Sequence, residues 1–154
     1  MELILELCNK SGKSINRSFL AEVVKRTLLT SGCKPLARKK ITLSVAVVCG
    51  KEIKKLNRVY RKINKTTDVL SFAEYKNQAQ LKKEIKKEIF LGEVVICFKE
   101  IERYAKSRKI PEKEELARMM SHATLHLLGF KHGRQMFALQ EKAAAAVRKA
   151  APGC

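Results

Sequence analysis

The segment that most constrains the fold is the run of nine residues at 41–49, whose sequence is ITLSVAVVC. It is apolar and rich in β-branched side chains, a composition typical of a buried strand. Segments 2–8, 69–75 and 89–97 have a similar strand-type pattern, and Gly92 is a candidate β-bulge in the last of them. Strands of this kind need helices to cover them, so the runs predict a small sheet inside a mixed domain.

Patterns of helical period fill most of the remaining chain. One helix is predicted after a cap at Ser14 or Asn16, and another is predicted to start near Pro111 and to stop at Gly129. Segment 76–88 is nearly all polar and predicts a surface loop or a short solvated helix. We therefore expect a single α/β (α+β) domain over 1–154, a small mixed β-sheet packed with helices. The other predicted helices cover 53–63, 98–108 and 134–150, and the first of them has an apolar face that includes Tyr60 and Ile63.

Charge narrows the class of partner. The chain has 33 Lys and Arg against 15 Asp and Glu, a net charge of +18, and the excess is spread along its whole length. A body this basic attracts a polyanion such as RNA, DNA or an anionic membrane face. The plainer interpretation is that the proteins of the source organism are rich in lysine in general, which raises the net charge without any polyanionic partner. With no Trp and only 6% aromatic residues, the chain is poorly equipped to stack single-stranded bases.

The sequence also predicts a reduced, cytoplasmic setting without membrane contact. No apolar run approaches the roughly 20 residues that span a bilayer, and the start Met1-Glu2-Leu3 has no secretory pattern. The five cysteines are odd in number and form no Cys-x-x-Cys pair, which argues against a disulfide framework or a Cys-rich zinc ribbon. Cys49 and Cys97 end apolar runs and are predicted to be core thiols.

The three histidines carry the clearest chemical signal. His122 and His126 are four residues apart, so they share one face of the predicted helix. Two nitrogens at this separation can each reach one metal ion at about 2.1 Å. His132 follows the turn at Gly129 and can approach the same point. Three neutral imidazoles leave one tetrahedral position open, which is the mark of a catalytic zinc ion that activates water.

Two other interpretations of the histidines stay open. A His pair at this spacing is often an ordinary helix face, although a third His after the turn, with none elsewhere, favours a metal. The His-Glu-x-x-His motif of zinc peptidases places its general base next to the first ligand. Ala123 stands there instead, so a peptidase would lack that base.

Residues 56–72 form a second candidate segment, in which basic residues precede a turn and a predicted strand. Arg61 is a candidate for a bidentate contact with a phosphate near the metal. Thr67 or Ser71 is a candidate to orient water or phosphate. For Arg58 and Lys62 a solvated helix face is the favoured interpretation.

Three blocks resemble the YbeY family of bacterial rRNA maturation endoribonucleases, in matching order over about 45–140. The segment 122–132 (HATLHLLGFKH) is similar to the family's H-G-x-L-H-L-x-G-Y-D-H signature. Residues 56–72 resemble its L-N-x-x-Y-R and T-D-V-L-S-F block, and 91–96 (LGEVVI) its L-G-D-I-x-I strand.

The resemblance implies a fold whose central helix, like that of zinc metalloproteases, carries the histidines. It implies a zinc-dependent, single-strand-specific endoribonuclease that matures the three-prime end of small-subunit rRNA and acts in ribosome biogenesis and quality control. The implied partners are rRNA, the small ribosomal subunit and a ribosome-assembly GTPase. By position His122, His126 and His132 would bind one zinc ion, and Arg61 would handle substrate phosphate.

The chain departs from the family pattern near the third ligand. Ala123 replaces the usual Gly, Lys131 and Glu93 replace Asp residues, and the segment from His132 to Met136 is shorter. Lys131 places a positive charge where the family tends to have a negative one. A non-catalytic rRNA-binding assembly factor with a structural metal stays open as an alternative, as does a zinc peptidase.

Overall fold

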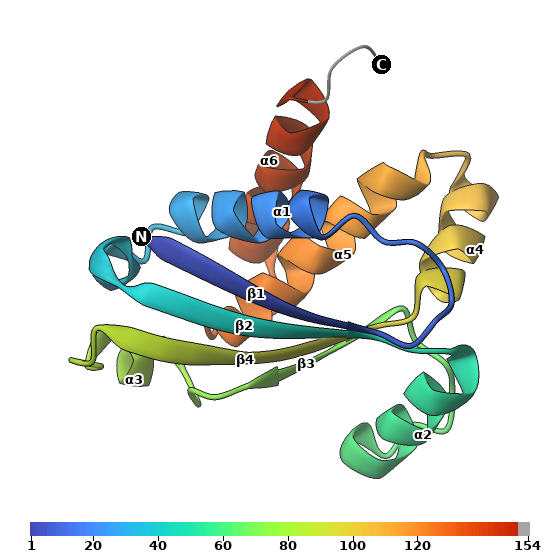
Figure 1. The fold of residues 1–154 in the computed structure, drawn as a ribbon, viewed down its shortest axis with the longest axis horizontal. Coiled ribbons are helices and arrows are strands. Elements are labelled where there is room, and N and C mark those ends of the chain that lie inside the picture. The colour runs from blue at the N-terminus through green and yellow to red at the C-terminus, as the bar shows by residue number, and fades with distance from the viewer. Residues whose placement is uncertain (151–154) are drawn as a thin grey trace.

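The computed structural model describes residues 1–150, and one mixed sheet runs through it (Figure 1). The strand order is β1-β2-β4-β3. β1, β2 and β4 are parallel, and β3 pairs antiparallel with β4 at the edge. The predicted fold class, a single domain with a small mixed sheet and packed helices, is confirmed. The strands are β1 (Glu2–Asn9), β2 (Lys40–Val47), β3 (Val69–Ala73) and β4 (Glu88–Ile96).

In the described part of the chain, six α-helices connect and cover the strands. Helix α1 begins after Asn16, whose side chain accepts a hydrogen bond from the Phe19 amide, so Asn16 is the cap. The polar segment 76–88 contains the short helix α3. Within residues 1–150, no helix has the length and apolar character needed to cross a bilayer. The helices are α1 (Arg17–Thr30), α2 (Gly50–Arg61), α3 (Gln78–Lys82), α4 (Phe98–Arg108), α5 (Glu112–Leu127) and α6 (Arg134–Ala150), with a short 3-10 helix at Lys34–Arg38.

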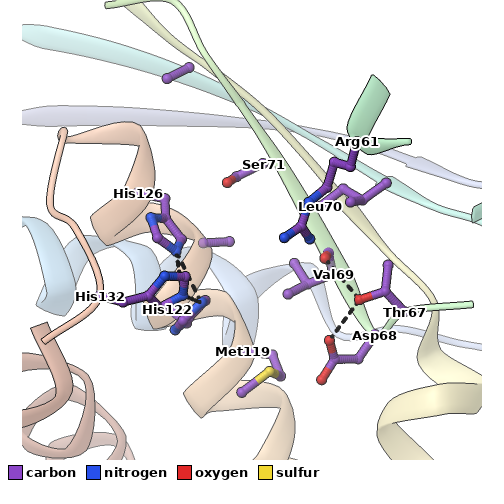
Figure 2. Close-up of a pocket in the computed structure, with 12 residues that line it drawn as sticks. Arg61, Thr67, Asp68, Val69, Leu70, Ser71, Met119, His122, His126 and His132 are labelled. Atoms are coloured by element: carbon purple, nitrogen blue, oxygen red, sulfur yellow. Dashed lines mark hydrogen bonds between the residues drawn. The ribbon is translucent and has the colours of Figure 1, made fainter. Parts of the chain in front are cut away.

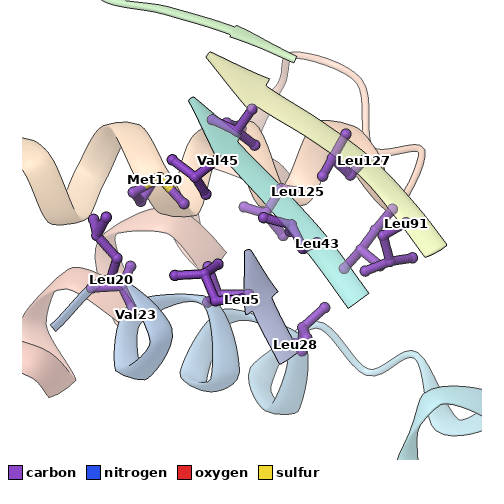
Figure 3. Close-up of a cluster of buried hydrophobic side chains, with 14 of the residues drawn as sticks. Leu5, Leu20, Val23, Leu28, Leu43, Val45, Leu91, Met120, Leu125 and Leu127 are labelled. Atoms are coloured by element: carbon purple, nitrogen blue, oxygen red, sulfur yellow. The ribbon is translucent and has the colours of Figure 1, made fainter. Parts of the chain in front are cut away.

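The main core lies between one face of the sheet and helices α1 and α5 (Figure 3). Along β2, side chains alternate between buried and half-buried because successive residues of a strand point to opposite faces. Leu43 and Val45 of β2 are thus buried against Leu20 of α1 and Met120 of α5. This packing fixes α5 across the middle of the sheet.

The opposite face of the sheet is covered at one end only. There α2 packs on it through a small cluster that includes Ile53, Leu70 and Val95. The uncovered part, here called the open face, exposes the side chains that alternate with the core residues of the three parallel strands. The open face comprises Glu2, Ile4, Glu6, Lys40, Thr42, Ser44, Glu88, Phe90 and Glu93.

The bulge predicted at Gly92 is present. The pairing of β2 with β4 shifts register between Thr42 and Leu43, and Gly92 has a φ of 139°. A Cβ at Gly92 would lie 2.2 Å from the carbonyl oxygen of Phe72 on β3, so only glycine fits this contact.

Three sequence expectations are wrong in detail. Strand β2 ends at Val47, which leaves Cys49 exposed at the start of α2 and not in the core. Helix α2 ends at Arg61 because Lys62 takes a left-handed conformation with a φ of 61°. Ile63 therefore lies beyond the helix, and both Ile63 and Tyr60, predicted to lie on its apolar face, are exposed. Cys97 is buried, as predicted.

Candidate metal centre

Helix α5 presents two of the three histidines on the face that it turns away from the core. Buried residues such as Ala123 and Leu125 fix the other face of the helix, and the Thr124 hydroxyl is satisfied by the Met120 carbonyl. On the face turned away from the core, His122 and His126 are half-buried. Their spacing of one turn stacks the two imidazoles along one side of α5.

A tight turn returns the chain to the same point. The amide of Gly129 donates to the carbonyl of His126, and that of Phe130 to the carbonyl of Leu125. Gly129 has a φ of 88°, and a Cβ on it would lie 2.6 Å from the backbone nitrogen of Gln78. Glycine is therefore required by both conformation and space. His132 follows immediately and faces His122 and His126.

The three Nε2 atoms converge (Figure 2). The distances are 3.1 Å between His122 and His126, 3.2 Å between His126 and His132, and 3.4 Å between His132 and His122. Two nitrogens bound tetrahedrally to one ion at about 2.05 Å would be about 3.3 Å apart. The observed triangle fits that geometry, and this group could hold a metal ion.

Two of the imidazoles are oriented by acceptors behind them. His122 Nδ1 lies 3.0 Å from Gln140 Oε1, and His126 Nδ1 lies 3.1 Å from the Phe130 carbonyl oxygen. In both cases an Nδ1–H can donate, which leaves the Nε2 lone pair free to bind a metal. Sequence reasoning missed Gln140, which is buried and comes from α6.

The surroundings of His122 and His126 favour their neutral forms. Burial lowers the pKa of His122, and it also lowers the pKa of His126, to which the neighbouring His122 adds in the same direction. A metal must displace any proton from an imidazole nitrogen before it can bind there. The lowered pKa values mean that little proton displacement is needed at neutral pH.

The histidines form one wall of a pocket of about 460 Å³. The opposite wall carries Arg61 at the end of α2, and Thr67, Asp68 and Ser71 in and before β3 (Figure 2). The exposed Arg61 is close enough to contribute to the lowered pKa of His126. The pocket therefore combines three nitrogens that could hold a metal ion with a cation that suits phosphate.

Comparison with known proteins decides the family. The family model described as Endoribonuclease YbeY matches residues 6–148.

The chain belongs to the YbeY family.

Curated relatives agree across most of their length. The Endoribonuclease YbeY of Persephonella marina is 32% identical over 136 residues, which cover 84% of this chain and 82% of the relative. That of Caldicellulosiruptor bescii is 35% identical over 117 residues, 73% of this chain and 74% of the relative. The solution structure of TM1509 from Thermotoga maritima has the same fold, with a TM-score of 0.60, 24% identity and coverage of 95% of this chain and 90% of that one.

In this YbeY family member, each site residue predicted from the sequence lines the pocket. Asp68 does so as well, and it is the one carboxylate among the lining residues that the structure describes. The Thr67 hydroxyl lies 3.4 Å from Asp68 Oδ1 and 3.4 Å from the Val69 carbonyl oxygen. The motif block 67–72 contained Asp68, but spacing alone gave no reason to assign it to the site.

The loop that leads into this wall is held by Asn57. Its side chain is 3% exposed and donates a hydrogen bond of 2.9 Å to the carbonyl oxygen of Lys65. Asn57 thus ties α2 to the turn before β3. Arg61 and Thr67 lie on either side of the turn that this bond holds.

Proposed function

We propose that the chain is a zinc-dependent endoribonuclease that cuts single-stranded RNA. Its task would be maturation of the three-prime end of small-subunit rRNA, with roles in ribosome biogenesis and quality control. Residues 1–154 would act as a single metal-dependent endoribonuclease domain in the cytoplasm. The observation that carries the proposal is the convergence of three Nε2 atoms opposite Arg61 in one pocket of a basic protein.

One zinc ion would be held by His122, His126 and His132. All three donors are nitrogen, which suits zinc and other late divalent metals better than magnesium or calcium. When bound, such an ion supplies Lewis acidity toward a phosphate oxygen and lowers the pKa of water. The side chains of the pocket would bind the phosphate and orient the water.

Arg61 would bind the phosphate of the cleaved bond. Its guanidinium can donate two parallel hydrogen bonds to phosphate oxygens and offset the negative charge that grows on them during attack. The Thr67 and Ser71 hydroxyls would orient water or phosphate beside it. RNA, with the small ribosomal subunit and a ribosome-assembly GTPase as further partners, would approach through the positive charge of the body.

Metal analysis and cleavage assays test the proposal together. Purified protein should contain about one equivalent of zinc and cut a single-stranded RNA, and chelation should abolish the cutting. His126→Ala should lose the metal and the activity, because two remaining imidazoles hold an ion weakly. Lys109→Ala, at the exposed end of α4, serves as the control and should match wild type. Equal cleavage by wild type, chelated protein and His126→Ala would contradict the proposal.

A non-catalytic rRNA-binding assembly factor is the second candidate. The even spread of positive charge favours it, because such a surface can dock on rRNA without any cleavage. In that case a variant without all three histidines would still co-sediment with ribosomes and restore rRNA processing. A zinc peptidase is disfavoured because the buried Ala123 offers no general base beside the first ligand. A casein assay checks this.

A further inference from the structure

A second, smaller cavity adjoins the metal centre on the side of α6. Its volume is about 250 Å³, and it shares His122 and His132 with the first pocket. A molecule bound between the three histidines and Arg61 would therefore lie only one imidazole ring away from this cavity. The remaining lining residues come from the turn before α6 and its first two turns: Gly133, Met136, Phe137 and Gln140.

Phe137 is the unusual member of this group. It is 62% exposed, whereas its neighbours Met136 and Gln140 on α6 are buried. The helix is thus anchored without Phe137, whose ring contributes little to the core. Phe137 lines the same cavity as His122 and His132. Its exposed ring therefore offers a flat apolar surface to a ligand near the candidate metal centre.

The charges around the cavity indicate what that ligand is. The six lining residues include no carboxylate, and the exposed Lys131 and Arg134 flank His132 and Gly133 on either side. An anionic chain with flat apolar groups satisfies both features. Single-stranded RNA has this composition, since phosphates alternate with bases that stack on aromatic side chains.

We propose that this cavity binds one nucleobase next to the cleaved phosphate, and that the base stacks on Phe137. The inference rests on the proposed function and adds a subsite to it. The phosphate lies between Arg61 and the histidines, and the neighbouring nucleotide turns toward α6. The stacking contact is tolerant of base identity, so it favours unpaired RNA over a helix without reading sequence.

Fluorescence anisotropy with a labelled ten-nucleotide single-stranded RNA tests this on the metal-loaded protein, with RNA integrity checked on a gel after each titration. Phe137→Ala and Phe137→Leu should weaken RNA binding about tenfold, whereas Phe137→Trp should bind at least as tightly as wild type. Inorganic polyphosphate, which has charge but no bases, should bind wild type and all three variants equally. Leu29→Ala removes a side chain of matching exposure (61%) on α1 and should change neither affinity.

The outcomes separate this inference from the proposed function. Wild-type RNA affinity in Phe137→Ala overturns the subsite, as does an equal loss of RNA and polyphosphate binding. Both results leave zinc-dependent cleavage by wild type intact. A wild type that neither binds nor cuts RNA instead overturns the proposed function. Phe137 is exposed and alanine favours helices, so the variants should fold, which their melting temperatures will show.

Discussion

At the scale of single residues, Gln140 connects α6 to the metal centre. Its Oε1 atom is the acceptor behind His122 Nδ1. We expect Gln140→Leu to lower zinc affinity about 10- to 100-fold, because the imidazole loses the partner that fixes its orientation and tautomer. Competition with a chromophoric chelator measures this affinity.

Two control variants make the Gln140 prediction specific. Gln140→Glu keeps an acceptor at the same place and should hold zinc at least as well as wild type. Gln135→Leu, at an exposed position near the start of the same helix, should have no effect. Unchanged affinity in Gln140→Leu would mean that His122 is oriented without Gln140.

Gly129 sets the turn between the second and third histidines. Gly129→Ala should destabilise the protein by at least about 2 kcal/mol, because a left-handed conformation costs an L-residue roughly 1–2 kcal/mol and the new Cβ would overlap the backbone of α3. Urea unfolding measures the change. Gly133→Ala is the matched control, since its Cβ would meet no atom within 4 Å. Equal stability of the two variants would contradict this account.

The ligands were predictable because they lie close together in the sequence. His122, His126 and the Gly129 turn belong to one helix end, whose geometry is fixed by helical period and by a glycine stop. Gln140 was not assigned because no motif marks it, and Asp68 was not assigned because its place inside the block at 67–72 gave it no role of its own. Only tertiary packing of α6 and β3 against α5 brings them there.

At the scale of elements, helix α5 begins with an acidic turn whose members differ in environment. Glu114 pairs with Arg118 at 2.9 Å, whereas Glu115 is 1% exposed. The positive end of a helix favours a carboxylate, but burial raises the pKa of Glu115. For this side chain, burial therefore outweighs the favourable helix end.

The raised pKa of Glu115 gives a pH dependence of definite sign. The folded state holds the proton more tightly than the unfolded state, so the stability contributed by this group is present below about pH 4.5 and is lost as the pH rises through the higher folded pKa. Glu115→Gln should therefore be more stable than wild type at pH 7 and equal to it at pH 4. Thermal unfolding at both pH values tests this.

Glu114→Gln is the control for that pair of measurements. It should be slightly less stable than wild type at pH 7, because it weakens the ion pair with Arg118. A Glu115→Gln variant that is also less stable at pH 7 would show that the buried carboxylate is held by its charge.

The types of the elements followed from periodicity, but the ends of β2 and α2 did not. The strand type of β2 and the helix type of α1 followed from the sequence, but β2 ends at Val47 and not at residue 49. The end of α2 was missed, because a left-handed lysine has no sequence signal as strong as that of glycine. The apolar spacing therefore continued from Tyr60 to Ile63, which lies past the residue where the helix stops.

At the scale of the whole molecule, positive and negative side chains are distributed unevenly over the surface. The open face of the sheet carries four glutamates, Glu2, Glu6, Glu88 and Glu93, although the chain has a net charge of +18. At the pocket, in contrast, Arg61 balances the single carboxylate of Asp68, and the exposed Lys131 and Arg134 add positive charge beside His132. A polyanion is repelled by the first surface and attracted to the second, so RNA should approach from the side of the histidines.

This orientation predicts which cations set the salt dependence of RNA binding. Removal of one cation that binds a phosphate should reduce the slope of log affinity against log salt by about 0.7–0.9. Arg61→Gln should therefore weaken binding of a single-stranded RNA and lower the slope by about that amount. Lys40→Gln removes one positive charge as well, but it lies on the open face beside Glu88 and should leave both quantities unchanged. If the two variants weaken binding equally across a salt titration, RNA does not select the pocket side, and the net charge alone attracts it.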